Sequence, residues 1–318
     1  MPTLTLQLRP ARITDRPDIE AISALTWEGT DYLPRYIEAW LADPNGEFYV
    51  AESPMGVVGT GKLTKLGAGE WWLEGLRVHP HHAGQGIGRA LHEYGVGRAM
   101  VLASGVLRFC TEYDNHAVHK MSMGTGFRQT ARFLRYTAEP DDRYRGGEAF
   151  RFLKESDLSS VWGFLRKSPT FALASGSTCE MRWLCRLITD ERLISWAAAE
   201  QMLGWYGAHG ELDGVIIALT VPPKTAEETP TLHVNYLDAA RGWLAPMAAA
   251  LRGWAAAQGI GAIRHMLPVA PERLVAIEQA GWRRPADGGG RACLFTKHLD
   301  TDQNTQEEST HATYNAEG

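Results

Sequence analysis

Three glycines alternate with other residues at Gly84, Gly86 and Gly88, directly after a predicted strand over 70–78 and directly before an amphipathic helix predicted to end near Ala103. Glycine lets the backbone take positive φ and lets a ligand approach it closely. The N–H groups at a helix start have no partner inside the helix and lie at the positive end of its dipole. The turn therefore predicts an anion site suited to a pyrophosphate. The alternative is a tight strand–helix connection that binds nothing.

Two common phosphate-binding loops do not fit this turn. A Walker A loop has Lys and then Ser or Thr after its last glycine, whereas here Arg89 and Ala90 follow. A dinucleotide-binding loop has the spacing GxGxxG in an early βαβ unit of a parallel sheet. The spacing here is GxGxG, and several predicted strands precede it.

The turn is the centre of a longer motif, V-x-P-x-x-[RQ]-G-x-G-[IV]-G-x-x-L. The matching residues are Val78, Pro80, Gly84, Gly86, Ile87, Gly88 and Leu91. A second motif, N-x-x-A-x-x-L-Y-x-x-x-G-F, is echoed at Asn115, Val118, Met121, Gly126 and Phe127. With both motifs in the correct order, the segment 5–137 resembles the GCN5-related N-acetyltransferase (GNAT) superfamily.

This resemblance implies a fold and a cofactor. The fold is α/β (α+β), a mixed and mainly antiparallel sheet flanked by helices, and acetyl-CoA is the acetyl donor. The strands bearing Leu76 and Phe109 would splay apart, and the backbone of Leu76 and Val78 would pair with the pantetheine amides. Asn115 would hold the same arm, or cap the helix that follows it. The pyrophosphate would bind backbone N–H groups of the turn, for which the candidates are Gly84, Gln85, Gly86, Ile87, Gly88 and Arg89. The Arg89 side chain would reach a phosphate or lie in solvent.

Two positions depart from the family pattern. Ala83 stands where the family has Arg or Gln, but the family's main phosphate contacts are backbone N–H groups, so we expect cofactor binding to survive. Ser122 stands where the family often has the Tyr that protonates the leaving thiolate. Ser122 is therefore a candidate acid with a higher pKa and a shorter reach, and water is the alternative.

Glu74 is the candidate general base. Strand alternation predicts that it shares a face with Trp72, Leu76 and Val78. A carboxylate on an apolar face has a raised pKa, which suits a base that takes a proton from an ammonium group directly or through a water. The alternative is a structural carboxylate that is exposed or ion-paired.

The acceptor side is predicted from residues near the first helices. Trp27, Glu28, Asp31 and Tyr32 fall where this fold forms a wall of the acceptor site, and acidic and aromatic side chains suit a cationic or imidazole-like amine. Helix capping and core packing are the alternative. The strings WEGTDYLP (27–34) and WLEGLRVHP (72–80) resemble, more weakly, the vertebrate histidine N-acetyltransferase group. That resemblance implies a small amino-acid-like amine.

No metal site is predicted. His79, His81 and His82 are close in sequence, but zinc needs convergent ligands and neighbouring residues at a strand end point in opposite directions. The four cysteines include no CxxC pair.

The chain also carries a second, weaker copy of the same element order. The string GAIRHML (261–267) echoes GVLRFCT (105–111), and residues 280–282 echo 125–127. Where the first copy has its glycine turn, the second has LDAARG (237–242), with Asp238 and one glycine. We predict a catalytic acetyl-CoA-binding domain over 1–140, closed by a strand at 133–137. A degenerate GNAT-like domain that binds no cofactor follows over 148–300, and a disordered tail over 301–318.

Composition narrows the functional class. The net charge of −5 and the pI of about 6.1 argue against a nucleic-acid partner. No apolar run is long enough to span a membrane, and the first twenty residues lack the apolar core of a secretory signal, so a cytoplasmic location is expected. The predicted function is acetyl transfer from acetyl-CoA to a primary amine of a small molecule, with amino acids among the candidates. The alternative is a non-catalytic CoA-binding or interaction protein. The acceptor's identity and the oligomeric state stay open.

Overall fold

A computed structural model describes residues 5–207, 209–286 and 288–299, and the predicted tail over 301–318 lies outside these residues. The chain divides into two compact units, and each unit is built from segments that are not contiguous in the sequence. Within the described residues, the first unit comprises residues 5–108, 123–127 and 296–299, and the second comprises residues 109–122 and 128–295. The predicted domains over 1–140 and 148–300 describe parts of the chain that would fold independently, and they stay a prediction.

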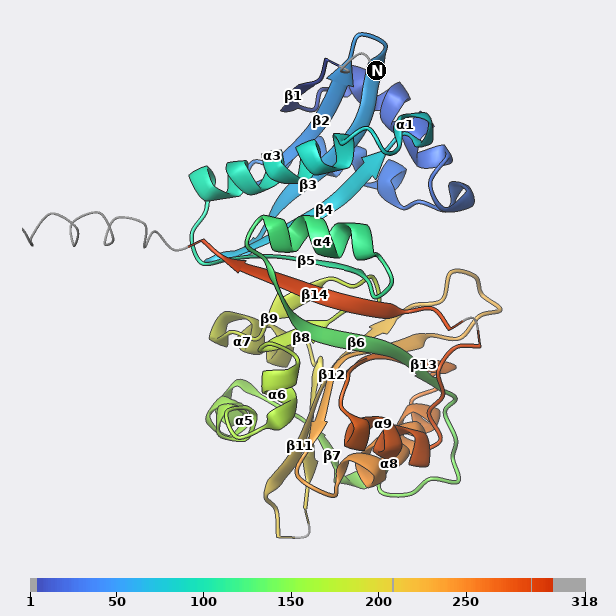
Figure 1. Cartoon of the computed structure of the whole chain (residues 1–318). Helices are drawn as coiled ribbons and strands as arrows, with labels where there is room; N and C mark the ends of the chain where they lie inside the picture. The colour runs from blue at the N-terminus through green and yellow to red at the C-terminus, as the bar shows by residue number, and fades with distance from the viewer. Residues whose placement is uncertain (1–4, 208, 287, 300–318) are drawn as a thin grey trace, which may run out of the picture. The chain divides into compact units, whose positions relative to one another are not determined.

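The first unit is built on a sheet that α3 crosses (Figure 1). Its strands follow the order β1 (Gln7–Pro10), β2 (Glu47–Ser53), β3 (Gly56–Gly67) and β4 (Glu70–Val78), each antiparallel to the next. β4 then pairs in parallel with residues 106–108 of β5 (Val106–Glu112). The helices are α1 (Arg16–Ala24), α2 (Ile37–Leu41) and α3 (Ile87–Leu102), with the short turns η1 (Ile13–Asp15), η2 (Trp27–Gly29), η3 (Leu33–Arg35) and η4 (Pro80–His82).

Small residues and apolar side chains fix these helices on the sheet. A Cβ built on Gly95 of α3 would lie 2.2 Å from Tyr49 Oη in β2, so glycine permits the close packing of α3. α1 and α2 contribute the fully buried Ile19 and Ile37 to a cluster with Val50 of β2. Each such side chain contributes about 1.5–3 kcal/mol on burial. Helices that come before β2 in the chain (α1 and α2) and after β4 (α3) thus pack on the sheet.

A β-bulge interrupts β4 at Gly75, whose φ is 66°. Lys62 of β3 pairs with Glu74, and Thr60 pairs with Arg77, so two steps along β3 face three steps along β4. The extra residue in β4 inverts the alternation of side chains beyond it.

The second unit repeats the strand pattern of the first. β7 (Phe150–Phe152), β10 (Met202–Tyr206), β11 (Leu212–Val221) and β12 (Thr231–Ala239) are successively antiparallel, and β12 is parallel to β13 (Ala262–Pro268). β12 carries a bulge against β11, as β4 does against β3. The remaining elements are α4 (His116–Gly124), α5 (Leu158–Leu165), α6 (Pro169–Leu173), α7 (Asp190–Ala198), α8 (Leu244–Ala257), α9 (Pro271–Gln279), η5 (Gly147–Ala149), η6 (Glu155–Asp157) and the small sheet β8 (Ser177–Cys179) and β9 (Cys185–Leu187). The expected tandem of mixed, mainly antiparallel sheets flanked by helices is confirmed.

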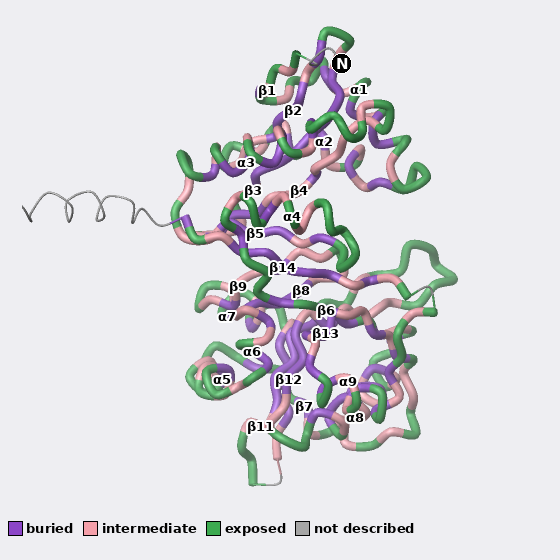
Figure 2. Tube along the Cα trace, in the orientation of Figure 1, coloured by how far each residue is buried: buried purple, intermediate pink, exposed green. Residues whose placement is uncertain are grey.

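The closing strands are exchanged between the two copies. β6 (Arg128–Ala138) pairs antiparallel with β13 of the second copy, so the expectation that residues 133–137 close the first copy is wrong. β14 (Arg291–His298) comes next to β6, and the rings of Phe109 in β5 and Phe295 in β14 stack at 5.2 Å. β14 is buried along most of its length (Figure 2). Local sequence patterns identify a strand but not its partner, which is why the exchange was not foreseen.

Candidate active site

The glycine turn presents its amides to open space. Gly84 and Gly86 have φ of 76° and 81°, and Gly86 is the N-cap of α3. In the described chain, the N–H groups of residues 84–89 have no hydrogen-bond acceptor, and Ala90 N–H is the first to find one, Gly86 O at 3.0 Å. A Cβ built on Gly84 or Gly86 would meet nothing within 4 Å. A row of amides beside an open volume at a helix N-terminus fits a pyrophosphate.

If a phosphate binds at this turn, its contacts would come mainly from the backbone. Arg89 is exposed, and its Nε donates to Glu93 at 2.7 Å. Gln85 is exposed. Ile87 is buried and anchors the turn, and a Cβ on Gly88 would lie 3.6 Å from a Val78 methyl. The structure therefore brings the predicted turn residues together around one set of amides.

β4 and β5 pair only at their first residues. Their ladder starts at Glu70 with Val106 and ends at Trp72 with Arg108. Leu76 and Val78 lie beyond the end of this ladder, on the part of β4 that leads into the turn. This is the geometry that the predicted opening requires, because a linear ligand could then pair with β4 as an added strand does.

The bulge decides which side chains of β4 share a face. The charges of Glu74 and Arg77 both act on the phenol of Tyr32. Val78 lies instead against α3, where Gly88 is its neighbour. The prediction that Glu74 shares its face with Val78 is therefore wrong, because the bulge inverts the alternation between them.

Glu74 lies in a half-buried position. It accepts a hydrogen bond from Thr64 Oγ1 at 2.6 Å. Its neighbour Tyr32 is half-buried too, and burial raises the pKa of the Tyr32 phenol. A carboxylate between a hydroxyl donor and an aromatic wall can accept a proton from an amine that binds there.

Arg77 is the functional candidate that the sequence analysis missed. Its Nη2 and Nε donate to the two carboxylate oxygens of Asp31 at 2.9 and 3.1 Å. Its Cζ lies 4.1 Å from the centroid of the Trp27 ring and 5.4 Å from that of Tyr32. The Asp31 side chain is fully buried, so it orients Arg77, whose own side chain is 10% exposed. The sequence signal was weak because the orientation of Arg77 depends on the bulge.

The segment that carries Trp27 has an unusual backbone. Trp27 and Glu28 have φ of 47° and 55°, a region that bulky L-residues rarely adopt. Each such residue costs about 1–3 kcal/mol and persists only where its surroundings hold it. The Trp27 residue is 60% exposed, and Glu28 is exposed. The structure thus places Trp27 and Tyr32 against Arg77, with the charge of Glu74 acting on Tyr32 and with Glu28 exposed.

Two predicted site residues belong to the second unit. Asn115 Oδ1 accepts from Val118 N–H at 3.3 Å, and its Nδ2 donates to Thr111 Oγ1 at 3.2 Å, so the side chain caps α4. Ser122 is fully buried, and its hydroxyl donates to the Val118 carbonyl at 2.7 Å. A hydroxyl hydrogen engaged inside its own helix gives no support to an acid role.

The second copy fills its corresponding opening with a side chain. The ladder between β12 and β13 ends at Val234 with His265. Beyond it, Arg273 of α9 donates from Nη2 to the Leu237 carbonyl at 2.8 Å. A protein side chain thus bonds the backbone of β12 beyond its ladder; in the first copy, Arg77 Nη1 donates to the Leu76 carbonyl of β4 at 3.0 Å.

Asp238, which the sequence predicts to exclude a pyrophosphate, belongs to the same network. Its Oδ1 accepts from Arg273 Nη1 at 3.4 Å, and its Oδ2 accepts from Tyr236 Oη at 3.0 Å and from Ser168 Oγ. Burial lowers the pKa of Arg273 and raises that of Tyr236. In the second copy, hydrogen-bonded polar side chains therefore occupy the region beyond the end of the ladder between β12 and β13.

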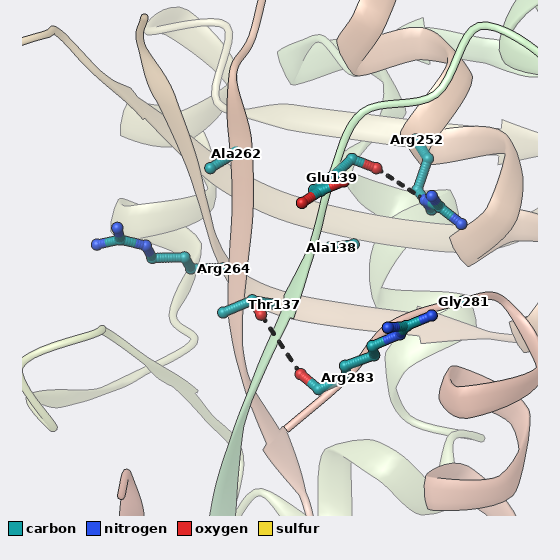
Figure 3. Close-up of a pocket in the computed structure, with 8 residues that line it drawn as sticks. All are labelled: Thr137, Ala138, Glu139, Arg252, Ala262, Arg264, Gly281 and Arg283. Carbon is teal, nitrogen blue, oxygen red and sulfur yellow. Dashed lines mark hydrogen bonds between the residues drawn. The ribbon is translucent and has the colours of Figure 1, made fainter. Parts of the chain in front are cut away.

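A cavity of about 410 Å³ in the second unit lies elsewhere, lined by Arg252, Arg264, Arg283 and Glu139 among others (Figure 3). The Arg252 guanidinium donates to the carbonyls of Glu139 and Ala280 at 2.8 and 3.2 Å. Arg264 points away from Arg252 and Arg283 (Figure 3). The arginines do not converge, so the cavity is not a candidate active site.

Among the described residues, no group of three or more His, Cys, Asp and Glu side chains could hold a metal ion. Within the same residues, no helix combines the length and apolar character needed to cross a membrane.

Comparisons with known proteins agree with this geometry. Residues 16–127 match the acetyltransferase (GNAT) family. The chain is 36% identical over 78 residues to the probable N-acetyltransferase 16 of Homo sapiens, covering 24% of this chain and 21% of that protein. It is 32% identical over 108 residues to the histidine N-acetyltransferase of Oreochromis niloticus, covering 34% of this chain and 28% of that protein. The chain thus spans only about a quarter of the length of these relatives.

Solved structures extend the likeness in fold beyond the first copy. A GCN5-related N-acetyltransferase from Sphaerobacter thermophilus aligns with a TM-score of 0.59 and 15% identity, over 92% of this chain and 96% of that one. A putative acetyltransferase from Thermoplasma acidophilum aligns with a TM-score of 0.52 and 16% identity, over 92% of this chain and 99% of that one. The motifs, the fold and these matches agree on one assignment: the segment 16–127 matches the GNAT family of acetyltransferases.

Proposed function

We propose that this chain transfers the acetyl group of acetyl-CoA to the primary amine of a small molecule, with amino acids among the acceptors. The observation that carries the proposal is the row of unpartnered N–H groups over 84–89 of the described chain, at the end of the strand that bears Glu74. β4 thus carries the proposed base, Glu74, and leads into the proposed phosphate site at the glycine turn. A non-catalytic CoA-binding or interaction protein is the alternative that the experiment below separates.

The chain's own groups hold the donor in place. Acetyl-CoA, when bound, supplies an activated acetyl group as a thioester. The amides of the glycine turn bind the diphosphate, and the β4 edge at Leu76 and Val78 pairs with the pantetheine arm. Holding donor and acceptor side by side supplies a large part of the acceleration, because the reaction no longer waits for a collision of two free molecules.

Glu74 and the backbone serve the chemical step. Glu74 accepts a proton from the acceptor's ammonium group, so that the neutral amine can attack the acetyl carbon. Backbone N–H groups near Val78 polarise the acetyl carbonyl. The C–N bond forms and the C–S bond breaks. The amine nitrogen, now positively charged, loses its second proton to water, and the leaving thiolate takes a proton from water, since the Ser122 hydroxyl is engaged with Val118.

The acceptor wall is formed by Trp27, Tyr32 and Arg77. The Arg77 guanidinium already lies over the Trp27 and Tyr32 rings, so the charge of a cationic amine would be met by Glu74. Arg77 donates from Nε and Nη2 to Asp31 and from Nη1 to the Leu76 carbonyl, and it offers its two remaining N–H groups to a polar group of the acceptor. The name of the Oreochromis niloticus relative, histidine N-acetyltransferase, places histidine among the first acceptors to test.

A thiol-release assay with acetyl-CoA and a panel of amino acids and polyamines tests the proposal. We expect turnover with at least one amine, and loss of most of it in Glu74→Gln. Glu38→Gln, on the exposed side of α2, is the matched control because Glu38 carries a solvent-exposed ion pair. Acetyl-CoA binding without turnover on any amine would favour the non-catalytic alternative.

A further inference from the structure

Three histidines gather on η4, directly before the glycine turn. The ring of His79 lies 4.9 Å from that of His81 and 5.7 Å from that of His82, measured between centroids. His81 is exposed, and the other two are half-buried. All three belong to the first unit, together with the amides of the turn.

The surroundings of this cluster are poor in negative charge. The charges that act on His79 are those of His81 and His82, which with burial lower its pKa. On the strand side, His79 N–H donates to the Val58 carbonyl of β3 at 2.9 Å. On the helix side, the charged side chains of the first turns of α3 are Arg89 and Glu93, which pair with each other. An anion placed here would therefore relieve a repulsion.

The three imidazoles have different roles. His79 Nδ1 accepts a hydrogen bond from His81 N–H at 3.3 Å, which requires a lone pair on that nitrogen. His79 therefore serves as a neutral cap of η4. His81 and His82 remain as the side chains that can take up a proton without breaking this cap.

The following inference rests on the proposed function. We propose that His81 and His82 bind the phosphate groups of the nucleotide end of CoA in their protonated form, so that cofactor binding takes up protons. Between residues 79 and 90, Arg89 is the one Lys or Arg in the sequence, and it already pairs with Glu93. The amides of the turn supply only partial charges, so the imidazoles complete the charge balance.

The expected effect follows from the distances at which exposed charges act. A protonated imidazole about 5 Å from a phosphate in water strengthens binding by about fourfold, and two such contacts by about tenfold. Because the contact forms with the protonated imidazoles, the affinity for CoA should rise as the pH falls from 8 to 6.

Calorimetric titration with dephospho-CoA and CoA, at pH 6 and pH 8, tests this inference. Dephospho-CoA keeps the diphosphate and lacks the 3′-phosphate, whose own second pKa of about 6 would otherwise titrate in the same range. The wild type should bind about tenfold more tightly at pH 6 than at pH 8. Its binding heat should depend on the ionisation enthalpy of the buffer, because protons are taken up. Proton uptake with both ligands assigns the contact to the diphosphate, and uptake with CoA alone assigns it to the 3′-phosphate.

The variant His81→Gln, His82→Gln should lose this pH dependence and keep its pH 8 affinity. The single variant His81→Gln, at the exposed position, should lose part of the pH dependence. It replaces the double variant in the test if the double variant does not fold. His209→Gln, which removes an exposed imidazole of the second unit, is the matched control. Equal wild-type affinity at both pH values, or a pH dependence retained by the double variant, overturns the inference while leaving the proposed function intact. Absence of CoA binding at either pH overturns both.

Discussion

Replacing Gly86 by aspartate should weaken acetyl-CoA binding by about 30-fold or more while leaving the fold intact. Gly86 has a φ of 81°, a conformation that Asn and Asp tolerate better than other L-residues, and a new Cβ there meets nothing within 4 Å. The cost in stability should therefore be about 1 kcal/mol, or roughly 2–4 °C in melting temperature. The new carboxylate would occupy the space that the diphosphate requires.

The charge part of the effect can be estimated. A carboxylate about 5 Å from a doubly charged diphosphate in water is repelled by about 2 kcal/mol, and by more where the ligand excludes solvent. That repulsion corresponds to roughly 30-fold weaker binding. Gly86→Asn adds nearly the same bulk without charge, so the ratio of its affinity to that of Gly86→Asp isolates the charge. A ratio near one would refute the assignment of a phosphate to this turn.

Gly242 provides a matched control inside the same chain. It lies in the second copy at the position corresponding to the glycine turn, with a φ of 85°, and a Cβ added there would meet nothing within 4 Å. Gly242→Asp should lower the melting temperature as much as Gly86→Asp does and leave the acetyl-CoA affinity unchanged. Calorimetry should give one site per chain. A stoichiometry of two, or weaker binding in Gly242→Asp, would contradict the division of labour between the copies.

The remaining predictions concern the base, the second copy and acid stability. Glu74→Gln should lower kcat by about 100-fold or more and leave acetyl-CoA binding unchanged; steady-state kinetics with calorimetry check this, and unchanged kcat would exclude the base role. Arg273→Ala should cost about 3–5 kcal/mol, because it leaves Asp238 buried without its charge partner, and urea unfolding measures it. Burial lowers the pKa of His92 to about 4 and that of His265 to about 3, so below pH 6.5 the unfolded chain binds protons that the folded chain does not. The free energy of unfolding should thus fall by up to about 1.4 kcal/mol per pH unit for each of them between pH 6 and pH 4; a His92→Gln variant as acid-sensitive as the wild type would contradict this.

The sequence was sufficient where the relevant chemistry is local. The glycine turn is one such case, because backbone conformation and N–H exposure at Gly84 and Gly86 depend on the residues themselves and on the helix that follows. The repeat is another, since each copy must bury the same arrangement of strands and helices. The ladder between β4 and β5 ends at Trp72, close to where the resemblance requires an opening.

The sequence was insufficient where a side chain's position depends on register. Glu74 and Val78 are four residues apart, and simple alternation places them on one face. The bulge at Gly75 separates them and turns Arg77 toward Asp31 and Trp27 instead. A single glycine within a strand is compatible with a bulge, but the register that defines the extra residue depends on the partner strand. The exchange of β6 onto β13 escaped prediction for the same reason.

The second copy shows that backbone groups beyond the end of a ladder between two strands need other hydrogen-bond partners. Polar backbone groups of β12 beyond the ladder cannot stay buried without partners, because each would cost about 1–3 kcal/mol. Arg273 satisfies the Leu237 carbonyl, His265 Nδ1 donates to the Val234 carbonyl at 2.7 Å, and Asp238 balances the arginine's charge. In the first copy the corresponding stretch of β4 leads into unpartnered amides of the described turn and is proposed to receive a ligand. The same sheet geometry thus holds a network of protein side chains in the second copy, and in the first copy it leads into the glycine turn where we propose that the ligand binds.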